Sequence, residues 1–474
     1  MSASIHTLGC RVNQYESQLL AERLSDLPGP VDVHVVNTCT VTALADRKSR
    51  QLVRRLTREH PGALVVAVGC GADGAGERLR AAGADLVVGN RDKARLRALL
   101  ETYLSTAETQ RTRRTSSWVL NSRPRGDEPS PQHSSADSAS LRWISATAGE
   151  CLEALGTGES LFAGEWRPLD EERVQGPVPR ARALLKVQDG CTQGCAFCRA
   201  WQVRGPLRSK SPAAARAEAE ALARAGHQEI VLVGINLAQY GEDLPEQPSL
   251  ADLLRDLLHV DGVRFRLSSF NPEGVTDELI AMFAQDKRLC PYLHLPLQSG
   301  DDAVLGRMGR PYTVAEYEER ARAFLDAVPR ATLGADVMVG FPGEDEAAFG
   351  RTVEVLAALT PLNVHIFRFS PRAGTPAARF TPWVSAAESA QRAARLADLA
   401  AGWSRVAQER FLGAVVEVVV EDAGGETSGG RSENYLPVEV RGGDAPRGTI
   451  VAVRLVEAAD GHLVGVMVDR AENG

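Results

Sequence analysis

Short apolar runs alternate with helical stretches over two long parts of the chain, and this alternation restricts the fold more than any other feature. Residues 1 to about 100 contain four runs with strand character, among them "VDVHVVNT" and "ALVVAVG". Each is followed by an amphipathic stretch such as "NQYESQLLAERLSDL". Alternating strands and helices predict βαβ units and a parallel sheet. We therefore expect a doubly wound α/β domain at residues 1–104.

The alternation resumes with a longer spacing between about residues 180 and 375. Six strand-like runs, from "ALLKVQ" to "VHIFRFS", are separated by five helical stretches. Six βα units predict an incomplete version of the eight-fold barrel, in which active residues lie at the carboxyl ends of the strands. We assign residues 179–404 to this partial (β/α)6 barrel. The tail, 405–474, has strand-like runs between Gly/Asp turns and predicts a small β-barrel.

Composition bounds the remaining choices. Residues 105–178 are rich in Ser, Thr, Pro and Arg and poor in apolar residues, which predicts a linker or insertion that is partly disordered. There is no run of eighteen apolar residues and no export signal, so we expect a cytoplasmic protein without a membrane partner. The net charge of −7 argues against a general nucleic-acid binder.

Three of the eight cysteines lie close together after the first barrel strand. Cys191, Cys195 and Cys198 form a CxxxCxxC motif. In a chain without an export signal, such thiols predict metal or catalytic roles before disulfides. Three thiolates at this spacing suit one corner of a 4Fe-4S cluster and leave one iron open to a substrate or cofactor. The alternative is a zinc site that a distant Cys or His completes.

A second group of three cysteines lies in the N-terminal domain. Cys10, Cys39 and Cys70 each follow a predicted strand. Because successive parallel strands end at the same edge of a sheet, these thiols can converge although they are far apart in the sequence. The alternative is three unrelated buried cysteines. Cys151 and Cys290 belong to no motif and are interpreted as plain thiols.

With both groups in view, the sequence resembles the methylthiotransferases of the radical S-adenosylmethionine (SAM) superfamily. The resemblance covers nearly everything except residues 105–178. It is carried by segments such as "TLGCRVNQYES", "NTCTVTALADRKSRQ", "LLKVQDGC", "HLPLQSGDDAVLGRMGR" and "DVMVGFPGED". It implies an N-terminal domain with an auxiliary 4Fe-4S cluster, a radical SAM partial barrel and a C-terminal TRAM barrel.

The sequence after the first cysteine separates the branches of this family. Arg11, Val12 and Asn13, together with "NTCTVT" and "GINLAQYG", are similar to the branch that acts on N6-threonylcarbamoyladenosine beside the anticodon of tRNA. One alternative is the branch that modifies an aspartate of a ribosomal protein. Another is an iron–sulfur protein without catalysis that binds RNA or senses redox state.

The resemblance also implies the cofactors, the partners and the chemistry. Two 4Fe-4S clusters would bind, one to Cys191, Cys195 and Cys198 and the auxiliary one to Cys10, Cys39 and Cys70. One SAM molecule would methylate a sulfur held at the auxiliary cluster, and another would yield the 5′-deoxyadenosyl radical that activates carbon 2 of the adenine. Besides tRNA, the partners would be a reducing electron donor and a sulfur source.

Candidate SAM-binding residues follow from the same resemblance and lie in the cysteine loop or after barrel strands. A simple turn or a structural βα loop is the alternative for the glycine-containing segments. His294 lies in the predicted strand "YLHLPL" and Asp336 in "GADVMVG". Both are interpreted as residues with a structural role in the core and are not counted among the candidates. The candidates are Phe197, Gly234, Asn236, Ser268, Gln298, Gly340, Phe341 and Pro342.

A basic helix follows Cys39 and is the candidate RNA-binding surface. Its cationic residues recur at steps of three and four and so form one stripe, which suits RNA phosphates. A solvated charged face is the alternative. The tail carries seven arginines against twelve acidic residues, so a role in RNA binding is doubtful there. The candidate RNA-binding residues are Arg47, Lys48, Arg50, Arg54 and Arg58.

Two further positions are ambiguous. Tyr435 is interpreted as part of the core of the tail, with stacking on a base as the alternative. After Cys198 the chain reads Arg199, Ala200, Trp201, where the resembled family usually has two aliphatic residues and a proline. This departure is expected to change the rim of the barrel near the substrate.

Overall fold

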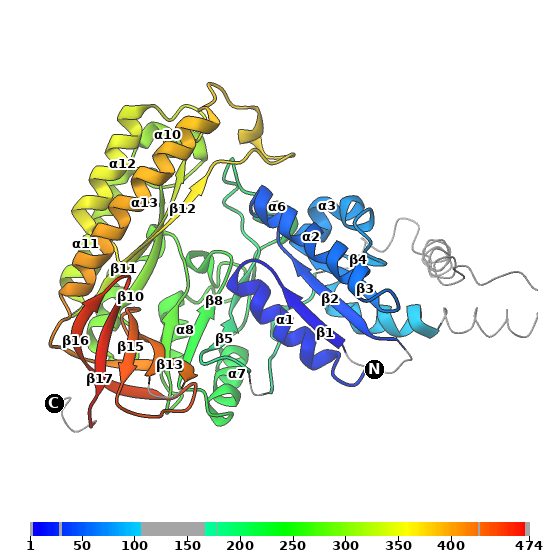
Figure 1. The fold of residues 1–474 in the computed structure, drawn as a ribbon, viewed down its shortest axis with the longest axis horizontal. Coiled ribbons are helices and arrows are strands. Elements are labelled where there is room, and N and C mark those ends of the chain that lie inside the picture. The colour runs from blue at the N-terminus through cyan, green and yellow to red at the C-terminus, as the bar shows by residue number, and fades with distance from the viewer. Residues whose placement is uncertain (1–2, 28–30, 106–165, 177, 425–426, 470–474) are drawn as a thin grey trace, which may run out of the picture. The chain divides into compact units, whose positions relative to one another are not determined.

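The computed structural model describes residues 3–27, 31–105, 166–176, 178–424 and 427–469. The chain divides into two compact units, Met1–Arg167 and Pro168–Gly474 (Figure 1). Cys151 and most of the predicted linker 105–178 lie outside the described residues. Within the described ranges, no helix is long and apolar enough to cross a membrane.

The first unit is built on a four-stranded parallel sheet with the strand order β1-β2-β3-β4. Alternate residues of β2 face opposite sides, so Val33 and Val35 belong to one apolar core and Val36 to another. α1 and the helical residues 96–105 contribute to the first core, and α2 and α3 to the second. The predicted parallel-sheet domain with helices on both faces is confirmed. Its elements are β1 (Ala3–Thr7), α1 (Arg11–Arg23), β2 (Val33–Thr38), α2 (Ala43–Glu59), β3 (Leu64–Gly69), α3 (Cys70–Arg80) and β4 (Leu86–Val88).

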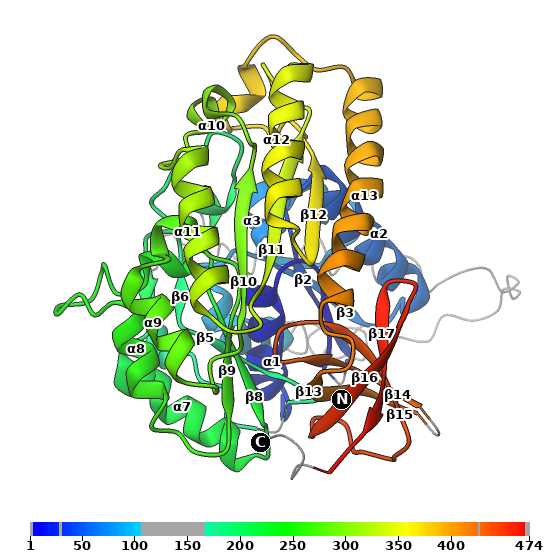
Figure 2. The ribbon, with the colours of Figure 1, turned by 90° about the vertical axis from the view of Figure 1, so that its left-hand side faces the viewer.

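The second unit contains the predicted six parallel strands. They form two three-stranded sheets, β5-β8-β9 and β10-β11-β12, which a parallel bridge between Phe265 and Leu289 joins. Figure 2 shows helices α11, α12 and α13 lying over one face of β10, β11 and β12. The six-stranded partial barrel is therefore confirmed. Its strands are β5 (Ala183–Lys186), β8 (Glu229–Val233), β9 (Arg264–Leu267), β10 (Tyr292–Gln298), β11 (Thr332–Val339) and β12 (Asn363–Arg368).

The barrel helices begin where the sequence provides caps. Ser249, Thr313 and Ser385 each form a capping box at the start of a helix, which satisfies two otherwise unpaired backbone donors. α6 and α10 are two short helices that the sequence prediction does not include. The helices are α6 (Ala200–Val203), α7 (Pro212–Arg224), α8 (Leu250–Leu257), α9 (Asp277–Gln285), α10 (Asp302–Met308), α11 (Val314–Ala327), α12 (Glu346–Leu359) and α13 (Ala386–Glu409).

The tail forms a closed five-stranded barrel in the order β13-β14-β15-β17-β16, which confirms the predicted small β-barrel. β14 was missing from the prediction because its sequence, TSGGRS, contains no apolar side chain. The helix α13 continues past residue 404, where the sequence analysis separates the two barrels. The strands are β13 (Val415–Gly424), β14 (Thr427–Ser432), β15 (Pro437–Arg441), β16 (Ile450–Ala459) and β17 (His462–Met467).

A buried polar contact joins the small barrel to the partial barrel. Tyr435 packs against the core of the tail, as expected, and its ring also stacks on Tyr292 of β10 with centroids 4.4 Å apart. Arg266 of β9 donates to the carbonyl oxygens of Ser432 and Glu433 at 3.0 and 2.9 Å. Tyr435 is therefore engaged inside the second unit rather than presented to a nucleic-acid base.

Candidate functional site

The three N-terminal cysteines follow three neighbouring parallel strands. In the sheet register Thr7 lies opposite Asn37, and Thr38 lies opposite Gly69, so Cys10, Cys39 and Cys70 come after the strands at the same edge. Gly9 has a φ of +100°, and a Cβ added to it would lie 2.8 Å from the sulfur of Cys39. Only glycine fits this turn without displacing the thiol.

Asn13 fixes the turn that carries Cys10 against the turn that carries Cys39. Its side-chain amide is fully buried and donates to the carbonyl oxygens of Leu8 at 2.8 Å and Thr38 at 3.0 Å. Asn37 of β2 donates in return to the carbonyl oxygen of Asn13 at 2.9 Å. Asn13, which belongs to the sequence signature after Cys10, therefore has a structural role beside the thiols.

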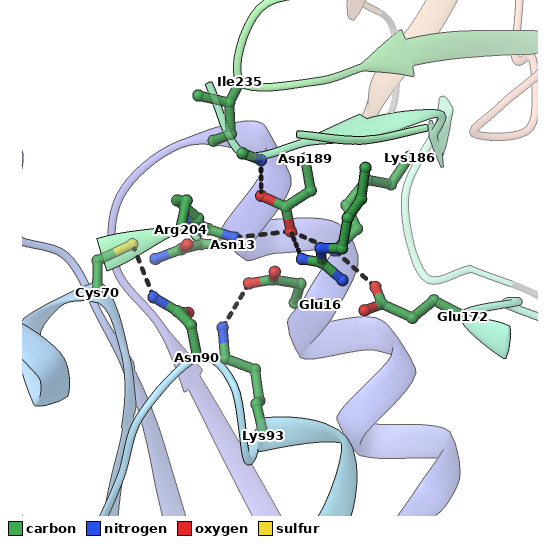
Figure 3. A network of polar contacts seen from close by, with 12 residues as sticks. Asn13, Glu16, Cys70, Asn90, Lys93, Glu172, Lys186, Asp189, Arg204 and Ile235 are labelled. Atoms are coloured by element: carbon green, nitrogen blue, oxygen red, sulfur yellow. Dashed lines mark hydrogen bonds and ion pairs between the residues drawn. The ribbon is translucent and has the colours of Figure 1, made fainter. Parts of the chain in front are cut away.

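Helix N-termini surround this cysteine group. Cys10 is the N-cap of α1, Cys70 is the first residue of α3, and Cys39 lies three residues before Thr42, the N-cap of α2. The positive ends of helix dipoles favour thiolates, which are the form that binds iron. Asn90 also donates from its side-chain amide to the sulfur of Cys70 at 3.6 Å (Figure 3).

The CxxxCxxC loop lies at the carboxyl end of the first barrel strand, as predicted. The amide of Cys198 donates to the carbonyl oxygen of Cys195 at 3.0 Å, and the amide of Ala200 donates to the sulfur of Cys198 at 3.3 Å. Arg310 places its Nη1 3.3 Å from the sulfur of Cys195. Arg310 is not among the predicted site residues, although it is the last residue of the segment "HLPLQSGDDAVLGRMGR" that carries the family resemblance.

Burial sets the protonation of two thiols of this loop, Cys191 and Cys198, when no metal compensates it. Burial raises the pKa of Cys191 and raises the pKa of Cys198 to about 11. The side chains therefore favour the thiol form by themselves, and binding of a cation such as iron reverses that preference.

Both cysteine groups suit a 4Fe-4S cluster by their chemistry. In such a cluster each thiolate binds a different iron, so three cysteines hold three irons and leave the fourth open to a further ligand.

A buried carboxylate holds the base of the CxxxCxxC loop. Asp189, which ends the short strand β6 (Gln188–Asp189), accepts from the amide of Gly190 at 2.8 Å. Its Oδ2 lies 3.0 Å from Lys186 Nζ, 3.1 Å from Arg208 Nη2 and 3.5 Å from Arg204 Nη1. Figure 3 shows the Lys186 and Arg204 side chains converging on Asp189. The sequence analysis did not single out this residue, although "QDGC" places an acid two residues before the first cysteine.

Several candidate SAM-binding residues follow adjacent barrel strands. Gly234 and Asn236 come after β8, Ser268 after β9, Gln298 ends β10, and Gly340 follows β11. The side-chain nitrogen of Asn236 and the hydroxyl of Ser268 are buried without a hydrogen-bond partner in the described part of the chain. Buried polar groups are normally paired, so these two fit a polar ligand at this rim.

The segment after β11 is packed differently. Phe341 is fully buried and meets Phe197 edge to face at a centroid distance of 6.4 Å. The amides of Gly340 and Phe341 both donate to the carboxylate of Glu344, and the carbonyl oxygen of Pro342 accepts from Arg307 at 3.1 Å. These backbone groups are engaged within the protein, so any contact with SAM here would be through the apolar surface.

The predicted basic stripe lies on α2. Arg47, Lys48, Arg54 and Arg58 are exposed and Arg50 is half-buried. Arg58 lies 3.8 Å from Glu59, an exposed pair of small energetic value. Two large apolar side chains at the start of the helix, Val41 and Leu44, are each 56% exposed. The surface that begins beside Cys39 therefore offers both positive charge and apolar area.

The residues after Cys198, where this chain departs from the family pattern, form a short helix. Ala200 and Trp201 begin α6, and Arg199 is its N-cap. The Nε of Arg199 and the indole nitrogen of Trp201 are buried without a hydrogen-bond partner among the residues described. The backbone N–H of Trp201 also forms a hydrogen bond with the sulfur of Cys198, a donor that a proline at this position would not have.

Comparisons with known proteins agree with this architecture. Residues 2–89 match the Uncharacterized protein family UPF0004, and residues 185–356 match the Radical SAM superfamily. Threonylcarbamoyladenosine tRNA methylthiotransferase MtaB of Bacillus subtilis is 32% identical over 99% of this chain and 97% of its own length. Ribosomal protein uS12 methylthiotransferase RimO of a Roseiflexus species is 33% identical over the full length of both.

A further sequence relative and a solved structure identify the family and the fold. The tRNA-2-methylthio-N(6)-dimethylallyladenosine synthase of a Jannaschia species is 31% identical over 98% of this chain and 93% of its own. Among solved structures, the radical SAM methyltransferase TsrM of Kitasatospora setae shares the fold, with a TM-score of 0.51, 15% identity, and coverage of 80% of this chain and 75% of its own. The chain therefore belongs to the radical SAM methylthiotransferases, enzymes that use S-adenosylmethionine and a 4Fe-4S cluster.

Proposed function

We propose that this enzyme adds a methylthio group to carbon 2 of N6-threonylcarbamoyladenosine in tRNA, using two 4Fe-4S clusters. The observation that carries the proposal is the second cysteine group, Cys10, Cys39 and Cys70, at one edge of its own sheet and separate in the chain from the CxxxCxxC loop. A radical SAM enzyme that only generates a radical needs one group, so the second suits the handling of sulfur.

The substrate is proposed from sequence and charge together. Relatives named for threonylcarbamoyladenosine tRNA in Bacillus subtilis and Thermotoga maritima are each 32% identical to this chain. A ribosomal-protein enzyme reaches 33%, so identity alone does not select the branch. The residues Arg11, Val12 and Asn13 favour the tRNA branch, and the exposed cations of α2 suit a polyanionic substrate.

Cys191, Cys195 and Cys198 would hold the radical-generating cluster, which supplies the electron that cleaves SAM when both are bound. Arg310 donates a hydrogen bond to the sulfur of Cys195 and so stabilises negative charge on it. Asn236 and Ser268 would bind polar groups of SAM, and Asp189 keeps the loop in place. Cys10, Cys39 and Cys70 would hold the auxiliary cluster, which keeps the sulfur to be transferred.

Two partners complete the proposal. A reducing protein or small reductant must deliver electrons to the cluster, and a sulfur donor must replace the sulfur that each turnover consumes. The basic stripe of α2 would bind the RNA backbone, and the exposed Val41 and Leu44 beside it would pack against the nucleoside or its neighbours.

Nucleoside mass spectrometry of a strain that lacks this protein tests the proposal. We expect 2-methylthio-N6-threonylcarbamoyladenosine to disappear, N6-threonylcarbamoyladenosine to accumulate, and the protein expressed from a plasmid to restore the modification. Unchanged tRNA nucleosides with loss of the methylthio group from a ribosomal protein would establish the alternative branch. Absence of 5′-deoxyadenosine when the reduced protein meets SAM would establish a protein without catalysis.

A further inference from the structure

Three metal-binding side chains converge in the second unit, in strands that carry none of the cluster cysteines. Nε2 of His294 lies 2.8 Å from Oδ1 of Asp336, and Nδ1 of His365 lies 3.1 Å from the same oxygen. The three residues offer ligand atoms that all lie within 4.8 Å of one another. The two imidazole rings face each other at a centroid distance of 4.8 Å.

The register of three adjacent strands brings these residues together. Asp336 of β11 lies opposite His365 of β12 and opposite Pro296 of β10, two residues beyond His294. Leu293 and Ala335, which directly precede His294 and Asp336, are buried. Helices α11, α12 and α13 cover one face of these strands (Figure 2). Because side chains alternate along a strand, the two histidines and the aspartate share the inner face of the partial barrel.

A supporting residue orients the most buried histidine. The hydroxyl of Tyr292 lies 3.0 Å from Nδ1 of His294, and the side-chain amide of Asn363 donates to that hydroxyl at 3.4 Å. A histidine that binds a metal through one ring nitrogen usually bonds an oxygen through the other. Tyr292 supplies that oxygen and leaves Nε2 of His294 directed at Asp336.

The charge and the exposure of these three side chains suit a cation that keeps one coordination position free. The carboxylate of Asp336 supplies a negatively charged oxygen ligand, and each neutral imidazole offers one nitrogen lone pair to a metal ion. The side chain of His294 is 9% exposed, that of Asp336 is 19% exposed, and that of His365 is 61% exposed. An ion would enter, and keep a free position, on the side of His365.

We propose that His294, Asp336 and His365 bind a divalent first-row transition-metal ion, with at least one coordination position left for water or an oxygen of the substrate. Two imidazoles and one carboxylate are a common ligand set for zinc and for non-haem iron(II), and three protein ligands leave such ions open to a further ligand. This site is independent of the cysteine clusters and does not rest on the identity of the tRNA substrate.

Mn²⁺ binding to the anaerobically purified holoprotein, with its clusters in the oxidised diamagnetic state, tests the proposal. Loss of the free Mn²⁺ signal in electron paramagnetic resonance measures binding, and electron spin echo modulation detects histidine nitrogens at the ion. We expect one Mn²⁺ per chain coupled to two histidine nitrogens, and its displacement by Zn²⁺, which such ligands bind more tightly.

Variants connect the signal to these side chains. Asp336→Ala should abolish Mn²⁺ binding, and His365→Ala, at an exposed position where folding is not at risk, should remove one nitrogen coupling. Tyr292→Phe keeps the stacked ring but removes the hydroxyl, and it should weaken binding about 10- to 100-fold. His259→Ala replaces an exposed histidine elsewhere in the second unit and should have no effect.

Iron content and circular dichroism of each variant confirm that the clusters and the fold persist. If the wild type binds no Mn²⁺, or binds it equally with and without Asp336 and His365, the three side chains form a hydrogen-bonded network only and the proposal is wrong.

Discussion

Asp189 is the anion on which several buried cations converge at the base of the CxxxCxxC loop, and we predict that Asp189→Asn destabilises this loop. The side chain of Asp189 is 3% exposed, Lys186 is 0% exposed and Arg204 is 1% exposed. Asparagine keeps the shape and an acceptor for the amide of Gly190 but removes the negative charge. The cations then remain buried with less compensation.

The expected cost follows from this geometry. Removing one partner of a buried ion pair typically costs about 3–5 kcal/mol. Lys186 keeps a second anion, because Glu172 lies 2.6 Å from its Nζ, so we expect the lower end, about 3 kcal/mol. Since about 1.4 kcal/mol corresponds to a factor of ten, local opening of the loop should become about a hundredfold more frequent.

Hydrogen–deuterium exchange of peptides from residues 183–210, under conditions where exchange follows the opening equilibrium, measures this change without requiring two-state unfolding. The matched control is Asp256→Asn, which breaks an exposed pair with Arg216 at 2.8 Å and should cost at most about 1 kcal/mol. If exchange of the loop in Asp189→Asn rises by less than fivefold, or no more than in the control, the buried network does not stabilise the loop.

Substitutions of charged residues elsewhere in the chain test other contacts. Arg266 and Arg264 hold the pKa of the buried Glu229 below its usual range despite its burial, so its stabilisation is fully present above about pH 4.5 and is lost progressively at lower pH. The melting-temperature difference between Glu229→Gln and wild type should be constant from pH 7 to about pH 5 and shrink below about pH 4.5, and a difference that stays constant down to about pH 3 would contradict this. Arg310→Met removes a donor and a positive charge 3.3 Å from the sulfur of Cys195, so the reduction potential of that cluster should become more negative in a spectroscopic redox titration, whereas an unchanged potential would exclude the contact in the holoprotein. Arg47→Ala and Arg54→Ala should each weaken tRNA binding and lower the slope of log affinity against log salt by about 0.7–0.9. The control Arg224→Ala, on α7, should leave the slope unchanged. Equal slopes in all three variants would show that α2 does not bind the tRNA.

The fold was predictable from the sequence where its pattern is strong. β3 and β8 are nearly continuous apolar runs, which is typical of parallel strands that are buried on both faces, and the helical stretches between such runs make the βαβ pattern visible. β14 was missed because TSGGRS lacks such a run and is held by its neighbours β13 and β15 in the closed barrel. α10 was missed because seven residues are too few for a clear helical period, although Asp301 caps it.

The site was predictable only in part, for a physical reason. Spacing along the chain is informative for Cys191, Cys195 and Cys198, which share one loop, and strand order extends it to Cys10, Cys39 and Cys70. Contacts between distant segments leave no such pattern. Arg310 reaches Cys195 across 115 positions, and His294, Asp336 and His365 meet only through the register of β10, β11 and β12.

Iron and sulfide analysis of the anaerobically purified protein, with and without the three N-terminal thiols, tests the two-cluster account most directly. We predict about eight irons per chain in the wild type, from two four-iron clusters. In the variant with Cys10, Cys39 and Cys70 all changed to alanine, about four irons should remain, and reductive cleavage of SAM to 5′-deoxyadenosine should persist while methylthio transfer is lost. About four irons in the wild type, or the full complement in the variant, would contradict the account.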